Sequence, residues 1–128
     1  METQTAQHKK KVLIVEDDAF LQSLLSQKLL SKGYVLLTSR EGIKAIEIAK
    51  AEQPDIILLD ILLPGMNGFD VLEELKGNEA TKHINVIMLS NLGQQTDIEK
   101  ALKLGASQFL VKANTTPDEV IRKIEGNK

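Results

Sequence analysis

Four short runs of apolar residues recur along the chain, and each one ends at a polar side chain. The runs cover residues 12–15, 56–59, 84–89 (interrupted by Asn85) and 109–111. Apolar runs of this length, without alternation, are typical of strands that are buried on both faces of a parallel sheet. The polar groups that follow them are, in order, the acidic cluster Glu16-Asp17-Asp18, then Asp60, Ser90 and Lys112.

Segments with helical periodicity separate these runs. Apolar residues at helical spacing mark the first three helices, and S/T-x-x-E/Q capping boxes mark the last two. The markers are Phe20, Leu21, Leu24, Leu25 and Leu29; Ile43, Ala45, Ile46 and Ala49; Phe69, Leu72 and Leu75; Thr96 to Glu99; and Thr116 to Glu119, with Pro117 at the first helical position. A further strand is predicted at residues 34–38, and Gly33, Pro54, Gly77 and Gly105 end the helices that precede them.

Five successive βα units predict an α/β fold with a doubly wound, five-stranded parallel sheet. The carboxyl ends of parallel strands meet at one edge of a sheet, which is where ligands bind in open α/β folds. We therefore expect the acidic cluster, Asp60, Ser90 and Lys112 to lie close together, although they are far apart in the sequence.

Length and composition narrow the class of protein. The chain has 128 residues, no cysteine and a formal net charge of -2, which suits one domain and gives no reason to expect direct binding of nucleic acid. We predict a disordered polar tail at residues 1–10 and a folded domain at 11–126. No signal peptide or membrane-spanning run is apparent, so we expect a cytoplasmic protein without a membrane partner.

The predicted edge suits a divalent cation and a phosphoryl group. Several carboxylates close together repel one another, and their hard oxygens suit Mg²⁺, which typically binds together with a phosphate. Lys112 could pair with a phosphoryl group and Ser90 could donate to it, while the Asp60 carboxylate could attack phosphorus to form an aspartyl phosphate.

These residues together resemble those of a response-regulator receiver domain. The resemblance rests on Glu16-Asp17, on Asp60 with the loop from Pro64 to Gly68 behind it, on Ser90 and on Lys112, and it covers roughly residues 11 to 125. It implies a flavodoxin-like fold with strand order 2-1-3-4-5. It also implies a phosphoryl donor, either a sensor histidine kinase or a histidine phosphotransfer protein, and no enzymatic turnover of outside substrates.

The resemblance also implies roles for individual residues. Asp60 would accept the phosphoryl group, and Mg²⁺ would be bound by Asp17, Asp60 and the backbone carbonyl of Leu62, with Glu16 acting through a water. Ser90 would reorient toward the phosphoryl oxygens, and Phe109 would be the aromatic switch residue. An output partner would read the surface made by the fourth helix, the fifth strand and the fifth helix.

Four residues depart from the pattern of the family or modify it. Receivers usually carry a cis proline after the lysine, whereas Ala113 stands here; because a cis bond before a non-proline residue costs about 2.5–4 kcal/mol, we expect a trans bond and a rearranged loop. Asn91 is larger than the residue usual after the hydroxyl, and its effect stays open. Leu62 and Leu92 occupy positions that tune dephosphorylation, and because apolar side chains cannot orient an attacking water, we predict slow self-dephosphorylation.

Three other functions remain to be weighed. A Mg²⁺-dependent phosphatase of the haloacid-dehalogenase type would need an acid where Leu62 stands. A flavodoxin-like cofactor-binding module would need a phosphate-binding loop after the first strand, where Glu16-Asp17-Asp18 would repel phosphate. A receiver-shaped scaffold that binds partners without being phosphorylated is the third alternative, and Asn91 and Ala113 keep it open.

Overall fold

Strands and helices alternate strictly along the chain. The computed structural model describes residues 10–126, so the predicted tail at residues 1–10 lies, apart from Lys10, outside the described residues. The elements are β1 (Lys11–Val15), α1 (Ala19–Ser31), β2 (Val35–Ser39), α2 (Gly42–Glu52), β3 (Ile56–Leu59), α3 (Gly68–Lys76), β4 (Asn85–Ser90), α4 (Gln95–Lys103), β5 (Gln108–Val111), the short 3-10 turn η2 (Lys112–Asn114) and α5 (Pro117–Glu125).

The five strands form one parallel sheet in the order β2-β1-β3-β4-β5. This order confirms the predicted flavodoxin-like α/β fold. Val15 pairs in register with both Ser39 of β2 and Leu59 of β3, and Met88 of β4 lies opposite both Leu59 and Phe109 of β5. The strands therefore end nearly level, and the loops that follow them share one edge of the sheet.

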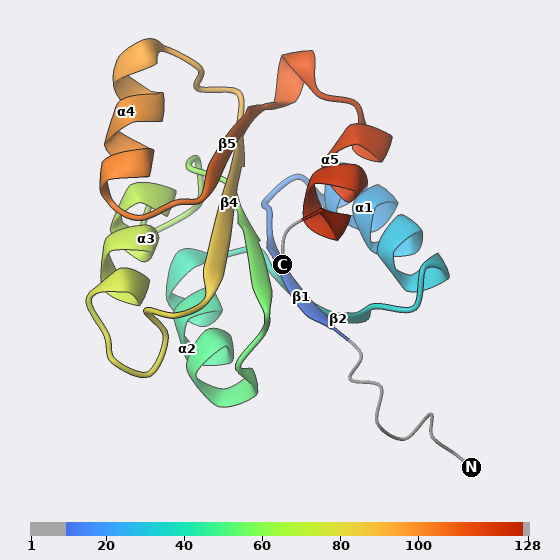
Figure 1. Cartoon of the computed structure of the whole chain (residues 1–128), viewed down its shortest axis with the longest axis horizontal. Helices are drawn as coiled ribbons and strands as arrows, with labels where there is room; N and C mark the ends of the chain where they lie inside the picture. The colour runs from blue at the N-terminus through green and yellow to red at the C-terminus, as the bar shows by residue number, and fades with distance from the viewer. Residues whose placement is uncertain (1–9, 127–128) are drawn as a thin grey trace.

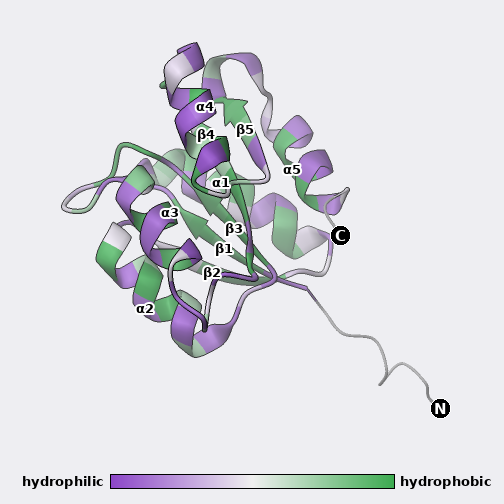
Figure 2. Ribbon diagram, turned by 60° about the vertical axis from the view of Figure 1, so that its left-hand side comes forward, coloured by the Kyte–Doolittle hydropathy of each residue, from purple (hydrophilic) through white to green (hydrophobic). Residues whose placement is uncertain are grey.

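Helices cover both faces of the sheet and bury a separate core on each. Helices α2, α3 and α4 lie on one face, and α1 and α5 on the other (Figure 1). Alternate residues of a strand enter different cores: Leu13 and Val15 face the first helix layer, while Val12 and Ile14 face the second. Figure 2 shows the resulting pattern, in which the strands are mostly hydrophobic and the helices are striped.

Two of the apolar residues that mark the helical spacing are exposed in the structure. Phe20 is 77% exposed and Ile43 is 55% exposed. Each is the second residue of its helix, α1 and α2 respectively, so it lies in the first turn, at the rim of the sheet rather than over its centre. The periodicity thus correctly predicted the two helices, although these two of its marker residues do not contribute to the core.

The cap of α4 also differs from the prediction. Thr96 does not cap this helix; Gln94 is the N-cap residue and its side chain makes no capping hydrogen bond. The backbone N–H groups of Asp97 and Ile98 donate to the Gln94 carbonyl, so the chain is already helical before Thr96. Glu99 accepts instead from the side chain of Gln95, at 3.1 Å.

The capping box of α5 is confirmed. Thr116 accepts a hydrogen bond from the backbone N–H of Glu119, and the Glu119 side chain accepts one from the backbone N–H of Thr116, with Pro117 at the start of the helix. Such reciprocal bonds satisfy two backbone donors that a helix start leaves without partners.

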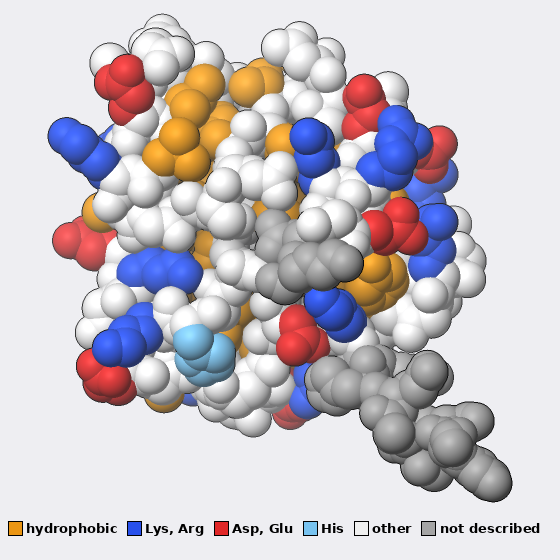
Figure 3. All heavy atoms as spheres, in the orientation of Figure 1, with side chains coloured by type: hydrophobic (Ala, Val, Ile, Leu, Met, Phe, Trp, Pro, Cys, Tyr) orange, Lys and Arg blue, Asp and Glu red, His pale blue; other side chains and the backbone are white. Residues whose placement is uncertain are grey.

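Charged side chains of both signs are interspersed over the face of the molecule seen in Figure 3. Among the described helices, none combines the length and the apolar character that crossing a membrane would require.

Candidate functional site

Two buried carboxylates share one ammonium group at the carboxyl edge of the sheet. Glu16 follows β1, Asp60 follows β3 and Lys112 follows β5, and the two acids are only 3% and 5% exposed. The Lys112 Nζ lies 2.8 Å from Asp60 Oδ2 and 2.9 Å from Glu16 Oε1. These three groups are separated by up to 96 positions in the sequence. They meet at the carboxyl edge of the sheet, as their positions after the strands predicted.

The electrostatics of this group follow from burial and pairing. Burial raises the pKa of Glu16, and hydrogen bonds from Lys112 and from the backbone N–H of Asp18 offset only part of that increase. Burial lowers the pKa of Lys112, but its hydrogen bonds to Asp60 and Glu16 outweigh burial and raise that pKa above its ordinary value of 10.5. The ammonium therefore stays charged at neutral pH, whereas Glu16 ionises less readily than an exposed glutamate.

Backbone contacts fix the position of Asp60. Its N–H donates to the carbonyl of Val15 at 3.0 Å, and its Oδ1 accepts from the N–H of Ile61 at 2.7 Å and of Leu62 at 3.3 Å. The carboxylate is thereby turned so that Oδ2 remains for Lys112. The chain itself, rather than a separate side chain, orients the group.

Gly68 allows α3 to start directly against this backbone. Its N–H donates to the carbonyl of Ile61 at 2.8 Å. A Cβ added at Gly68 would overlap the carbonyl oxygen of Asp60 and lie 2.7 Å from the Cα of Ile61. No side chain fits at that distance, so a substitution must displace Asp60 or the start of α3.

We expect Gly68→Ala to lower the free energy of unfolding by about 2 kcal/mol, because a methyl group would be forced against rigid backbone. Urea unfolding followed by circular dichroism measures this. Gly126→Ala is the matched control, since its Cβ would lie 3.4 Å from the Arg122 carbonyl, an ordinary contact. Equal stability of the two variants would contradict the expectation.

Asp17 lies at the same edge but is directed to a different partner. Its side chain is 50% exposed, and its Oδ1 lies 3.7 Å from Arg40 Nη2. Arg40 also donates to the backbone carbonyl of Asp17 at 3.0 Å. Asp18, by contrast, caps α1, because its Oδ1 accepts from the N–H groups of Phe20 and Leu21.

Ser90 and its neighbours form the other side of the site. Ser90 is the last residue of β4 and is fully buried, and its hydroxyl oxygen accepts from the backbone N–H of Leu92 at 3.3 Å. Asn91 is exposed in the loop that follows, and Leu92 is half-buried against the core under α3 and α4. In this state the hydroxyl is bonded to its own loop.

Phe109 and Leu62 differ in their surroundings. Phe109 is half-buried and packs against the core that includes Ala101 of α4. Leu62 is 58% exposed although it stands two residues after Asp60. An exposed leucine therefore lies at the rim of the site.

The peptide bond between Lys112 and Ala113 is trans, as are all others in the described part of the chain. This confirms the prediction. The residues that follow β5 form the single turn η2, and the backbone N–H of Thr115 closes it by donating to the carbonyl of Lys112. The lysine thus reaches Asp60 without the cis proline that is usual in receivers.

The donor set of this edge fits a hard divalent cation. Of the three carboxylates here, those of Glu16 and Asp60 share the ammonium of Lys112 and that of Asp17 lies beside Arg40. All of the candidate ligands are oxygens. Within residues 10–126, however, no three Asp, Glu or His side chains are close enough as they stand to hold one metal ion. A site built from Asp17 and Asp60, completed by a carbonyl and water, is compatible with this, because Mg²⁺ in proteins commonly has only one or two carboxylate ligands.

Two residues that the sequence reasoning missed hold the acidic loop. Gln22 of α1 donates to the carbonyls of Glu16 and Ser39, and Arg40 holds Asp17 as described above. The signal for Arg40 was present in the sequence, because β2 also ends at this edge and Arg40 directly follows it.

Comparison with known proteins finds sequence relatives that match most of the chain. The family model of the response regulator receiver domain matches residues 12–125. The response regulator PleD of Caulobacter vibrioides is 39% identical over 102 residues, which cover 80% of this chain and 22% of PleD. The chain spans less than half the length of the curated relatives that it matches.

Solved structures show the same fold. The BeF3-activated N-terminal receiver domain of RstA from Klebsiella pneumoniae superposes with a TM-score of 0.82 at 28% identity, covering 91% of this chain and 96% of that one. The receiver domain of the sensor histidine kinase PA1611 from Pseudomonas aeruginosa, with a magnesium ion coordinated in its active site cleft, gives 0.81 at 28% identity, covering 92% and 96%.

Proposed function

Because the chain belongs to the response regulator receiver family, we propose that it is a phospho-accepting switch of a two-component system or phosphorelay. Asp60 accepts the phosphoryl group, and the donor is a phosphohistidine of a sensor kinase or of a histidine phosphotransfer protein. The observation that carries this proposal is the contact between Lys112 Nζ and the buried Asp60 Oδ2, at 2.8 Å.

The transfer balances as a substitution at phosphorus. Asp60 Oδ1 already accepts two backbone hydrogen bonds, so Oδ2 attacks phosphorus, the P–N bond of the phosphohistidine breaks, and its electron pair returns to the imidazole. Lys112 stays beside the same oxygen and pairs with the charge that arrives. The role of the protein is mainly positioning and charge neutralisation.

The residues at the carboxyl edge of the sheet could also bind the magnesium ion that this transfer requires. Asp17, Asp60 and the backbone carbonyl of Leu62 would hold Mg²⁺, with Glu16 acting through a water. Bound there, the cation supplies positive charge to the phosphoryl oxygens. The relative PA1611 has a magnesium ion in its active site cleft, which supports the assignment.

The loops that follow β4 and β5 carry the conformational change that the phosphoryl group on Asp60 causes. A phosphoryl group adds roughly −1.5 to −2 of charge. The Ser90 hydroxyl, which now accepts from the backbone N–H of Leu92, donates to the phosphoryl oxygens as the loop that leads into α4 shifts. Phe109, packed beside α4, follows. We propose that an output partner binds the surface formed by α4, β5 and α5.

A cytoplasmic location of the protein stays a prediction.

Incubation of the purified protein with acetyl phosphate and Mg²⁺, followed by intact mass measurement, tests the function. We expect the gain of one phosphoryl group with Mg²⁺ and none with EDTA. If no gain occurs at any Mg²⁺ concentration, the alternative of an unphosphorylated binding scaffold replaces this proposal. A phosphatase assay on small phosphate esters should show no turnover, since Leu62 supplies no general acid.

Self-dephosphorylation is expected to be slow because Leu62 and Leu92 cannot orient an attacking water. Replacing both with asparagine should speed the loss of phosphate severalfold, measured as the decay of the phosphorylated mass after removal of acetyl phosphate. Leu102→Asn is the control, since Leu102 is also exposed, at 47%, but lies on α4. Unchanged decay in the double variant would refute the role of the two leucines.

A further inference from the structure

Arg40 lies at the same edge of the sheet, but its hydrogen bond and ion pair there are with Asp17 and not with Asp60 or Lys112. It follows β2, and its Nη2 lies 3.0 Å from the backbone carbonyl and 3.7 Å from the Oδ1 of Asp17. One guanidinium thus contacts both the backbone and the side chain of a proposed metal ligand. Asp60, the other carboxylate ligand, is paired with Lys112 instead.

The backbone beside Asp17 is held independently of Arg40. The N–H of Glu16 donates to the Ser39 carbonyl at 3.0 Å, and the Gln22 side chain bridges the Glu16 and Ser39 carbonyls at 3.2 and 3.0 Å. Removal of Arg40 therefore leaves the loop anchored at Glu16. The effect of Arg40 concentrates on Asp17 and on its carboxylate.

We propose that Arg40 is a positioning residue that competes with Mg²⁺ for the Asp17 carboxylate and so sets the affinity of the site for the metal. The inference rests on the proposed magnesium site. In the metal-free protein the guanidinium compensates the charge of Asp17. For the metal to bind, the carboxylate must leave Arg40, and the two cations then repel each other across a few ångströms.

The expected effect is moderate because both partners are half exposed. The side chains of Arg40 and Asp17 are 60% and 50% exposed, so water and salt screen the repulsion strongly. A unit charge about 5 Å from a divalent ion in a medium close to water still changes affinity by roughly three- to tenfold. Removal of Arg40 should tighten Mg²⁺ binding by that factor.

The opposite sign is expected if Arg40 only anchors the loop. In that case Arg40→Ala frees Asp17 to move, and the entropy of ordering it weakens Mg²⁺ binding. Arg40→Lys separates the contributions further, since it keeps the charge but replaces the guanidinium, whose Nη2 contacts the Asp17 carbonyl and carboxylate, with an ammonium of different reach and geometry.

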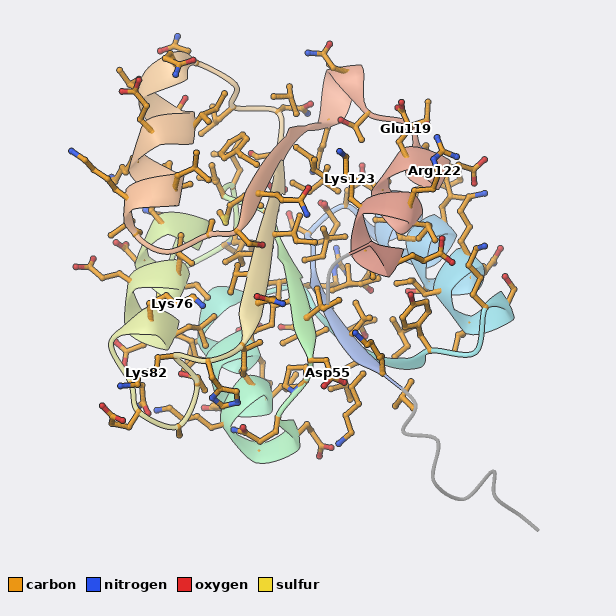
Figure 4. The ribbon with its side chains drawn as sticks, viewed as in Figure 1. Asp55, Lys76, Lys82, Glu119, Arg122 and Lys123 are labelled. Carbon is orange, nitrogen blue, oxygen red and sulfur yellow. The ribbon has the colours of Figure 1, made fainter. Side chains whose placement is uncertain are left out.

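Calorimetric titration of the metal-free full chain with Mg²⁺ alone tests the proposal, using wild type, Arg40→Ala, Arg40→Lys and Arg122→Ala. Arg122 is the other arginine of the chain and lies on α5 (Figure 4). The Arg122→Ala change therefore removes the same charge without removing a contact to Asp17. We expect tighter binding only in Arg40→Ala, Arg40→Lys close to wild type, and a difference that shrinks as salt is raised.

Weaker or unchanged binding in Arg40→Ala, while wild type binds Mg²⁺, overturns the role of Arg40 and leaves the magnesium site intact. An equal gain in Arg122→Ala also overturns it, because the effect would then be one of net charge. If wild type binds no Mg²⁺, both the site and this inference fail. The titration measures affinity directly, so a fault in phosphorylation cannot be mistaken for any of these results.

Discussion

Replacement of Asp60 by asparagine is expected to abolish phosphorylation by acetyl phosphate while the protein stays folded. The amide nitrogen and oxygen of asparagine are poor nucleophiles, so no acyl phosphate forms. The fold should survive because Lys112 keeps Glu16 as a partner, at 2.9 Å, and an amide oxygen can still accept from the N–H of Ile61. Intact mass after incubation with Mg²⁺ and acetyl phosphate measures the loss.

Asp70→Asn is the matched control for Asp60→Asn. Asp70 is an exposed aspartate in the first turn of α3, so the same change there should leave the gain of phosphate at the wild-type level. Retention of full phosphorylation by Asp60→Asn, with a native circular dichroism spectrum, would mean that another side chain accepts the group.

The second large effect is expected from Lys112→Met, which leaves two buried acids without their shared ammonium. Loss of one partner of a buried ion pair costs about 3–5 kcal/mol, and the Glu16 and Asp60 side chains are only 4% and 6% exposed. We therefore expect the free energy of unfolding to fall by about 3 kcal/mol at neutral pH, measured by urea denaturation. Phosphorylation should fall as well.

The loss in Lys112→Met should depend on pH. The pKa of Glu16 is already raised by burial, and removal of Lys112 raises it further. A carboxyl with a raised pKa in the folded state contributes stability below its unfolded value of 4.5, and that contribution is lost as pH rises through the folded pKa. The deficit of the variant relative to wild type should therefore grow from mildly acidic to neutral pH.

Lys123→Met controls for the loss of a lysine. Lys123 is exposed on α5 (Figure 4), and its replacement should change stability by no more than about 0.5 kcal/mol at either pH. A deficit in Lys112→Met that is as small as this, or that stays constant with pH, would show that the three groups are not coupled in solution.

The edge at which Glu16, Asp60 and Lys112 meet could be predicted from the sequence because buried parallel strands are nearly continuous apolar runs. A polar residue directly after such a run has to lie at the carboxyl edge of the sheet. The trans bond before Ala113 could also be predicted, since the intrinsic cost of a cis bond is high before any residue other than proline.

The direction of exposed side chains could not be predicted in this way. Asp17 follows β1 as closely as the sequence suggested, yet it contacts Arg40, and that choice depends on how two loops lie beside each other. The starts of helices posed a related difficulty. Phe20 and Ile43 fit the periodicity but lie in first turns at the rim, where spacing alone does not report whether the core extends beneath them.

The capping motif at Thr96 shows how a local signal is overridden. Its sequence matches a capping box as well as that of Thr116 does, but the chain before it is already helical and Gln95 pairs with Glu99. Residue type and spacing state which caps are possible, and the path of the preceding loop decides which of them forms.

The central claim, that Asp60 carries the phosphoryl group, is tested most directly by locating the group chemically. Borohydride reduces an aspartyl phosphate to homoserine, so protein phosphorylated with Mg²⁺ and acetyl phosphate can be reduced, digested and sequenced by mass spectrometry. We predict homoserine at position 60 and aspartate at positions 17 and 18. Homoserine at another acidic position, or none anywhere in protein that has gained phosphate, would contradict the account.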